Sequence, residues 1–145
     1  MTTLMMKQPG ETRLPMTTGL RRALMADGIL TGATGGLMLA GATLLDDLLG
    51  LPAGLLAGAG AFLLLFVAAV ALVASRPVIA RPAIRAIIAL NMFWIAESVI
   101  LLFTPWPGPN GLGSAFIVLQ AVVLLGLTEW QLLQLRRVGR QPVAR

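Results

Sequence analysis

Long apolar runs alternate with short polar segments along this chain. The runs cover residues 23–45, 51–75, 83–104 and 112–135, and each exceeds the roughly 20 residues that a helix needs to cross a ~30 Å hydrocarbon layer. A buried soluble bundle would need polar outer faces, and the second and fourth runs have almost none. The pattern therefore predicts an all-α membrane protein with four transmembrane helices.

The segments between the runs predict how the helices connect. Residues 46–50 read as a tight turn, and residues 105–111, which contain three prolines, cannot continue a helix. Between the second and third runs lies a basic linker, residues 76–85, in which Pro77 and Pro82 are expected to break the helix.

Three regions follow from this division. Residues 1–22 form a flexible basic cytoplasmic tail, residues 23–135 form the four-helix transmembrane domain, and residues 136–145 form a second basic cytoplasmic tail.

The basic residues all lie in alternate connections. They are Lys7, Arg13, Arg21 and Arg22, then Arg76, Arg81 and Arg85, then Arg136, Arg137, Arg140 and Arg145. Cytoplasmic loops of membrane proteins carry an excess of Lys and Arg, so the distribution predicts that both termini are cytoplasmic. Trp106, in the second outer turn, fits an anchor at the membrane surface.

The pattern also contains a candidate signal peptide and a candidate internal repeat. Residues 7–42 could form a signal peptide with Ala-Gly-Ala at 40–42 as its cleavage site, but the apolar run continues through Leu45 and contains Asp27. A faint repeat relates residues 22–27 to 85–90 and residues 60–65 to 114–119. It allows a parallel repeat of two helical hairpins about an axis along the membrane normal.

Composition narrows the function. The chain of 145 residues is 57% hydrophobic and 12% charged, with no Cys, His or Tyr. Disulfides, thiolate metal sites and the usual haem and zinc ligands are therefore excluded, and we expect no cofactor and no enzymatic activity. The net charge of +5 fits anionic lipid headgroups, so no nucleic acid partner is invoked.

One carboxylate, that of Glu97, lies well inside the third apolar run. Glu97 is twelve residues past Arg85, about 18 Å into a helix, with Asn91, Trp94 and Ser98 nearby. Because removal from water favours a neutral carboxylic acid, Glu97 is expected either to tie two helices together or to bind a proton or cation beside Trp94. The candidate hydrogen-bond partners of Glu97 are Thr34, Thr43, Ser98 and Gln120.

A second polar level lies nearer the cytoplasmic side. Asp27, Asn91 and Glu129 are each expected about 7–10 Å from the nearest basic residue at their helix ends. Asp27, Thr31 and Thr34 share one stripe of the first span. Asp27 and Glu129 could each extend toward the cytoplasmic surface or pair with Arg22 and Arg136, and both are expected to form salt bridges or orient their helices.

Glycines at four-residue spacing mark two helix faces. Gly28, Gly32 and Gly36 lie on the first span, and Gly54 and Gly58 lie on the second. Small residues at this spacing let helix backbones approach closely in lipid. They predict packing of these two helices on each other, or an interface with a second copy or a partner.

The run Ala-Leu-Asn-Met-Phe-Trp-Ile-Ala-Glu-Ser at residues 89–98, after an Arg/Pro-rich linker, resembles the third helix of small uncharacterised four-helix proteins of the bacterial inner membrane. The resemblance extends over about residues 21–137 and implies topology only. The bacterial inner membrane is the expected location. The small multidrug resistance transporters are similar in size and helix number, but their working carboxylate lies in helix one, whereas the deep carboxylate here is in the third span.

Two functions lead the hypotheses from the sequence; a third, a membrane enzyme of lipid chemistry, ranks last because the chain lacks His, Cys and clustered carboxylates. The leading hypothesis is an accessory or structural membrane protein that acts through helix–helix contacts, as a homo-oligomer or within a larger membrane complex. The alternative is a small proton-coupled transporter or binder of an amphipathic small molecule, centred on Glu97.

Overall fold

The computed structural model describes residues 13–105 and 108–140. In chain order the elements are β1 (Arg13–Pro15), α1 (Thr18–Ala40), α2 (Ala42–Leu49), α3 (Ala53–Ala74), β2 (Val78–Ala80), α4 (Arg81–Phe103) and α5 (Gly111–Gly139). Most of the two expected tails, residues 1–12 and 141–145, and Trp106 lie outside the described residues.

Helices α1, α3, α4 and α5 are each long and apolar enough to cross a membrane, which confirms the prediction of four such helices. Their ends differ from the predicted ones. α1 begins five residues early, at Thr18, because the Thr17 side chain accepts a hydrogen bond from the amide of Leu20 and caps the helix. α5 continues to Gly139, so the first residues of the expected C-terminal tail are helical.

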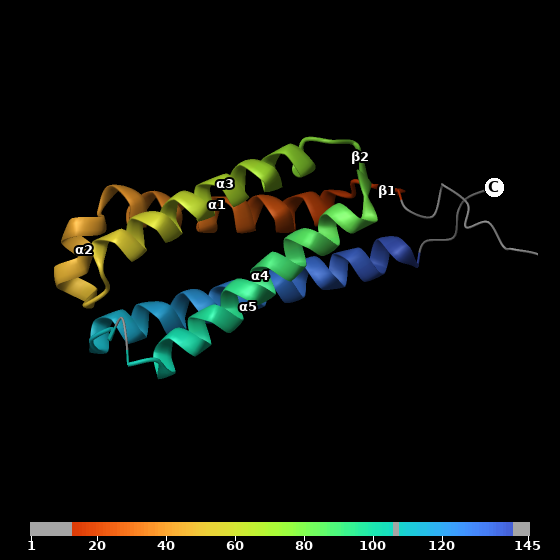
Figure 1. Cartoon of the computed structure of the whole chain (residues 1–145). Helices are drawn as coiled ribbons and strands as arrows, with labels where there is room; N and C mark the ends of the chain where they lie inside the picture. The colour runs from red at the N-terminus through yellow and green to blue at the C-terminus, as the bar shows by residue number, and fades with distance from the viewer. Residues whose placement is uncertain (1–12, 106–107, 141–145) are drawn as a thin grey trace, which may run out of the picture.

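The long helices pack as two hairpins (Figure 1). α1 lies along α3 and α4 lies along α5, while α1 also contacts α5. α3 and α4 barely touch each other. The helices therefore follow one another in the order α3, α1, α5, α4, and the arrangement is left open between its first and last members.

Close contact between α1 and α3 depends on one glycine pair. A Cβ on Gly60 would lie 2.6 Å from the carbonyl oxygen of Gly35, and a Cβ on Gly35 would lie 2.8 Å from the Cβ of Leu63. Real Cβ atoms do not come so near, so the backbones cross here because neither residue has a side chain.

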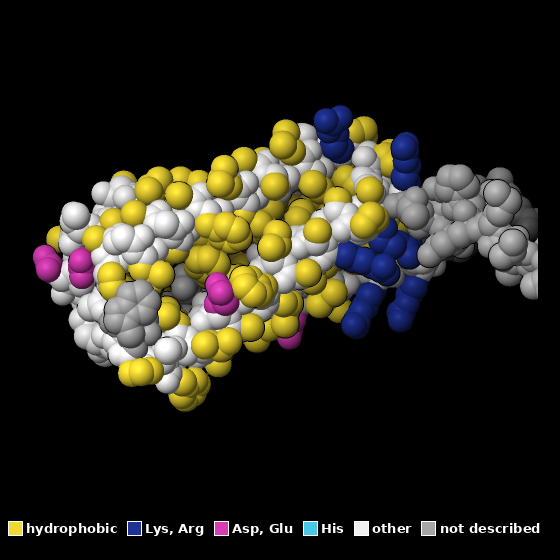
Figure 2. Space-filling model, in the orientation of Figure 1, with side chains coloured by type: hydrophobic (Ala, Val, Ile, Leu, Met, Phe, Trp, Pro, Cys, Tyr) yellow, Lys and Arg dark blue, Asp and Glu magenta, His cyan; other side chains and the backbone are white. Residues whose placement is uncertain are grey.

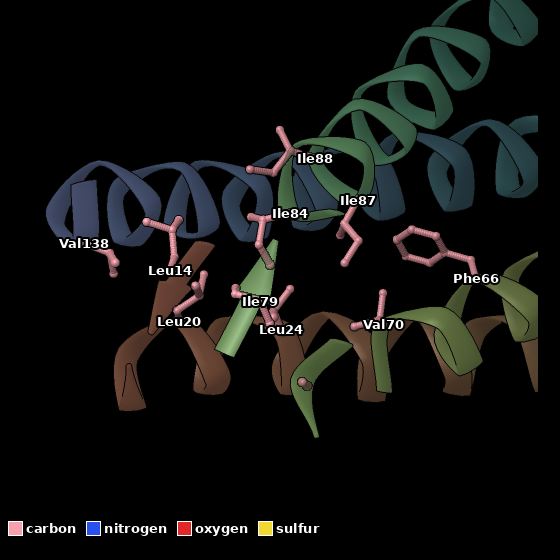
Figure 3. Close-up of a cluster of buried hydrophobic side chains, with 11 residues drawn as sticks. Leu14, Leu20, Leu24, Phe66, Val70, Ile79, Ile84, Ile87, Ile88 and Val138 are labelled. Carbon is pink, nitrogen blue, oxygen red and sulfur yellow. The ribbon is translucent and has the colours of Figure 1, made fainter. Parts of the chain in front are cut away.

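A cluster of buried apolar side chains joins all four long helices at one end of the molecule (Figure 3). Leu14 of β1 and Ile79 of β2 belong to it, because the two strands pair antiparallel and turn one face inward. This two-stranded ribbon was not predicted. It closes the end of the bundle by tying the segment before α1 to the connection before α4.

Two predicted connections differ in the structure. The expected tight turn at residues 46–50 is instead the last part of α2, and the chain reverses at Gly50, whose φ of 68° suits a residue without a side chain. The linker at residues 76–85 contains β2 and the start of α4. Pro82 lies in the first turn of α4, where its missing N–H breaks no hydrogen bond.

Charge is distributed unevenly between the two ends. Figure 2 shows the Arg side chains of the described residues gathered at the end where β1 and β2 lie. The opposite end carries Asp46 and Asp47 in α2. The alternation of basic and non-basic connections in the sequence thus becomes a basic end and an acidic end of one elongated molecule.

Candidate functional site

A buried polar cluster connects three helices around Asp27. Its carboxylate accepts a hydrogen bond from the Thr31 hydroxyl at 2.9 Å, from Asn91 Nδ2 at 2.8 Å and from Gln131 Nε2 at 2.7 Å. Asp27 and Gln131 are completely buried, and Asn91 is 3% exposed. We call Asp27, Thr31, Asn91 and Gln131 the Asp27 cluster; it fastens α4 and α5 to α1.

The cluster confirms part of the predicted polar level and corrects the rest. Asp27 and Asn91 do meet, but Glu129 is exposed and does not take part. The expected pairing of Asp27 with Arg22 is wrong, because the buried carboxylate bonds to neutral side chains instead, whereas Arg22 is exposed.

Gln131 occupies the position that was expected for Glu129. The two residues are two positions apart on α5, so their side chains point about 200° apart around the helix axis, and Glu129 faces outward when Gln131 faces inward. The buried face of α5 runs through Leu124, Thr128, Gln131 and Val138, at spacings of four, three and seven, but the surrounding apolar positions do not distinguish this face in the sequence.

Glu97 lies elsewhere than expected. It is an exposed residue of α4, and none of the hydrogen bonds found in the described residues involves it. Thr34 and Ser98, two of its expected partners, donate instead to the backbone oxygens of Leu30 and Trp94. Thr43 is exposed on α2. Ser98 is buried on the neighbouring face of α4, so the helix turns Ser98 inward and Glu97 outward.

Glu97 borders a groove between α3 and α4, which we call the α3–α4 groove. It has a volume of about 570 Å³ and is lined by Gly54, Gly58, Phe62, Trp94, Glu97, Ser98 and Gln120 among mostly apolar neighbours. The groove exists because α3 and α4 barely touch, and the face shown in Figure 2 is hollowed between the two helix pairs.

A smaller cavity lies beside the groove, next to the Asp27 cluster. It has a volume of about 210 Å³ and shares Phe62, Trp94, Phe116 and Gln120 with the groove. Its other lining residues include Thr31, Thr34 and Asn91. Two members of the Asp27 cluster therefore line a cavity that neighbours the groove.

Trp94 lies between the two spaces. Its ring stacks on that of Phe62, with centroids 6.0 Å apart and planes within 5° of parallel. The expected contact of Trp94 with a cationic guest would therefore use the ring face that Phe62 leaves uncovered. Gln120 is half-buried and lines both spaces.

The glycines singled out in the sequence are not those at the helix crossing. Gly28 and Gly32 face Val70 and Val67 of α3 at ordinary contact distances. Gly36, Gly54 and Gly58 have no atom within 4 Å of a Cβ placed on them, so they do not pack α1 on α3. Gly35 and Gly60 do, and nothing in the four-residue spacing distinguished them.

The chemistry of the cluster is that of one carboxylate among neutral groups. Within residues 13–105 and 108–140, no three His, Cys, Asp or Glu side chains converge to hold a metal ion. The oxygen of the Gln131 amide, Oε1, is buried and has no hydrogen-bond partner there.

Comparison with protein-family models, curated proteins and solved structures found no match to this chain.

Proposed function

We propose that this protein is an accessory or assembly component of a membrane, and that the α3–α4 groove seats a transmembrane helix of a second copy or of a larger membrane complex. The bacterial inner membrane is the proposed location, on the resemblance of residues 89–98. The observation that carries the proposal is the position of Gly54 and Gly58, which line the groove with open space before them.

Two glycines that no other helix of the chain contacts can serve in lipid as a packing site for another helix. Two apolar helices gain no hydrophobic energy by leaving lipid for each other, so association depends on close backbone approach and on polar contacts. Gly54 and Gly58 are one turn apart, and together they leave a strip of bare backbone on α3. A small molecule needs no such strip, whereas a crossing helix does.

Glu97 supplies the polar contact. An exposed carboxylate on a membrane-spanning helix is costly when it faces lipid, and side chains that hydrogen-bond between helices add about 0.6–2 kcal/mol to association. A partner helix with a Ser, Thr, Gln or basic side chain at the level of Glu97 would fill the groove and also satisfy this group.

Filling the groove tests the proposal. Gly58→Leu places a side chain in it, and Gly126→Leu is the matched control, because Gly126 also has nothing within 4 Å and does not line the groove. Native mass spectrometry of the gently extracted complex should show the second copy or partner subunit lost from Gly58→Leu and retained by Gly126→Leu. Equal retention by both variants would refute helix docking in the groove.

Photo-crosslinking identifies what occupies the groove. A photoreactive residue at Leu55, which lines the groove, should crosslink to a defined membrane helix, whereas one at Val122, exposed on α5 away from the groove, should not. Crosslinks to lipid alone from both positions would count against a protein occupant.

A second candidate function rests on the dimensions and lining of the groove. Its 570 Å³ lies within the 300–1,000 Å³ typical of small-molecule sites, and its aromatic floor and single carboxylate suit an amphipathic cation. In this alternative the protein binds or transports such a molecule, coupled to protons. A small molecule that co-purifies with the wild type and is lost on Glu97→Gln would favour it over helix docking.

The proposed orientation places the basic end of the molecule, with both termini, in the cytoplasm, where its arginines contact anionic headgroups. Because the chain has no Cys, the labelling of single introduced cysteines reports this orientation without background. Asp47→Cys should react with a membrane-impermeant maleimide in spheroplasts, whereas Ser75→Cys, at the basic end, should react only after permeabilisation. The opposite pattern would invert the topology.

A further inference from the structure

We propose that the helix seated in the α3–α4 groove belongs to a different protein and carries a Lys or Arg side chain that pairs with Glu97. This pairing requires a helix in the groove, so it rests on the proposed function. It goes further by stating the chemistry of the partner helix and by excluding a second copy of this chain.

Glu97 lies level with the bare backbone of α3. The two helices run in opposite directions along the bundle (Figure 1), and the ring of Trp94 stacks on that of Phe62. Glu97 is three residues further along α4, and Ala59, beside Gly58, is three residues back along α3. Because both helices rise about 1.5 Å per residue, a helix that crosses α3 at Gly58 comes level with the carboxylate on the other wall of the groove.

The chain does not provide a partner for Glu97. The side chain is exposed, and none of the hydrogen bonds found in residues 13–105 and 108–140 involves it. Glu97 lies six residues before Phe103, the last residue of α4, about 9 Å along the helix. Long Lys and Arg side chains extend from such depths to the membrane surface, whereas the side chain of Glu is too short. Ionisable groups within membrane helices commonly pair with one another, so the expected partner is a basic group from another molecule.

A second copy has no basic residue at this level. The arginines of the described residues gather at the end where β1 and β2 pair (Figure 2), and the sequence has no Lys or Arg between Arg22 and Arg76 or between Arg85 and Arg136. Arg85 is twelve residues before Glu97, about 18 Å along α4. Because the positive-inside rule gives every copy the same orientation, the basic end of a second copy would lie away from Glu97.

The surroundings of Glu97 suit an ammonium or guanidinium group. Trp94 lines the same groove one turn earlier on α4, and the ring face that Phe62 leaves uncovered can attract a cation. Gln120 is half-buried in the groove, and none of the hydrogen bonds found in the described residues involves it. Its amide oxygen is a second acceptor for the several N–H donors of Lys or Arg. A Ser or Thr hydroxyl has one donor and no charge to match the carboxylate.

Binding of designed peptides to the full chain in lipid vesicles tests the pairing. Two apolar peptides of about 20 Leu and Ala residues differ at one position, six residues from one end, where one has Lys and the other has Met. Energy transfer to a label on Asp47→Cys should show the Lys peptide binding on the order of 10-fold more tightly. Glu97→Gln should remove this preference. Glu129→Gln is the matched control, because Glu129 is also exposed but does not line the groove, and it should keep the preference.

A charge exchange strengthens the test. A third peptide with Glu in place of Lys should bind Glu97→Lys more tightly than it binds the wild type. If the Lys and Met peptides bind alike and Gly58→Leu abolishes the binding of both, a helix docks without a counter-charge, so the pairing is wrong and the proposed function stands. If Gly58→Leu changes the binding of neither peptide, both the pairing and helix docking in the groove are wrong.

Crosslinking in the native membrane distinguishes a different protein from a second copy. The photoreactive residue at Leu55 should join this chain to an apolar segment of another protein that contains a Lys or Arg. The yield should fall on the order of 10-fold in Glu97→Gln and stay unchanged in Glu129→Gln. Crosslinks to a second copy of this chain would support helix docking but overturn the pairing with a basic helix of another protein.

Discussion

Two carboxylates of the four long helices, Asp27 and Glu97, have opposite surroundings. Asp27 is completely buried and accepts three hydrogen bonds from side chains of α1, α4 and α5. Glu97 is exposed at the edge of the α3–α4 groove. In the first region the carboxylate is bonded by side chains of the same chain. The second region is open, and none of the hydrogen bonds found in the described residues involves Glu97. The comparison separates a group that holds the fold together from one that is available for binding.

The largest expected effect comes from removing each carboxylate in turn. Asp27→Ala leaves the buried amides of Asn91 and Gln131 without an acceptor, so the free energy of unfolding should fall by on the order of 3 kcal/mol. Glu97→Ala should change it by less than about 0.5 kcal/mol. Reversible unfolding of both variants in the same detergent measures the difference. Equal effects would show that the two regions do not differ as described.

The next contrast uses two glycines of α3 that are two residues apart. Gly60→Ala should destabilise the protein by about 1–3 kcal/mol, because the new Cβ would meet the carbonyl of Gly35 at 2.6 Å and force α1 and α3 apart. Gly58→Ala faces open space and should stabilise α3 by up to about 1 kcal/mol through helix propensity. Thermal unfolding followed by circular dichroism should show a lower melting temperature for Gly60→Ala and a higher one for Gly58→Ala.

The smallest contrast compares two threonines of α1. Thr31→Val removes a hydrogen bond to a buried carboxylate and should lower the free energy of unfolding by about 1–3 kcal/mol. Thr34→Val removes a bond to its own helix backbone and should leave the free energy of unfolding almost unchanged. Reversible unfolding of both variants in the same detergent measures the difference. Equal losses would show that the bond from Thr31 to Asp27 contributes no more than a bond to the helix backbone.

The sequence by itself determined the number of long helices, their approximate extent and the separation of basic from acidic connections. These follow from run length and composition, which are local properties. It also supplied two of the four cluster members as a polar level, Asp27 and Asn91, because depth along a helix is simply a residue count multiplied by the rise.

Only the tertiary structure decided which face of each helix turns inward. A helix that is apolar on all sides has no polar face to mark its outside, so neighbouring positions cannot be told apart. Gln131 rather than Glu129, Ser98 rather than Glu97, and Gly60 rather than Gly58 point into the protein for this reason. Each of these choices is a rotation about a helix axis, and it is set by contacts between residues far apart in the chain, such as the bond from Gln131 to Asp27.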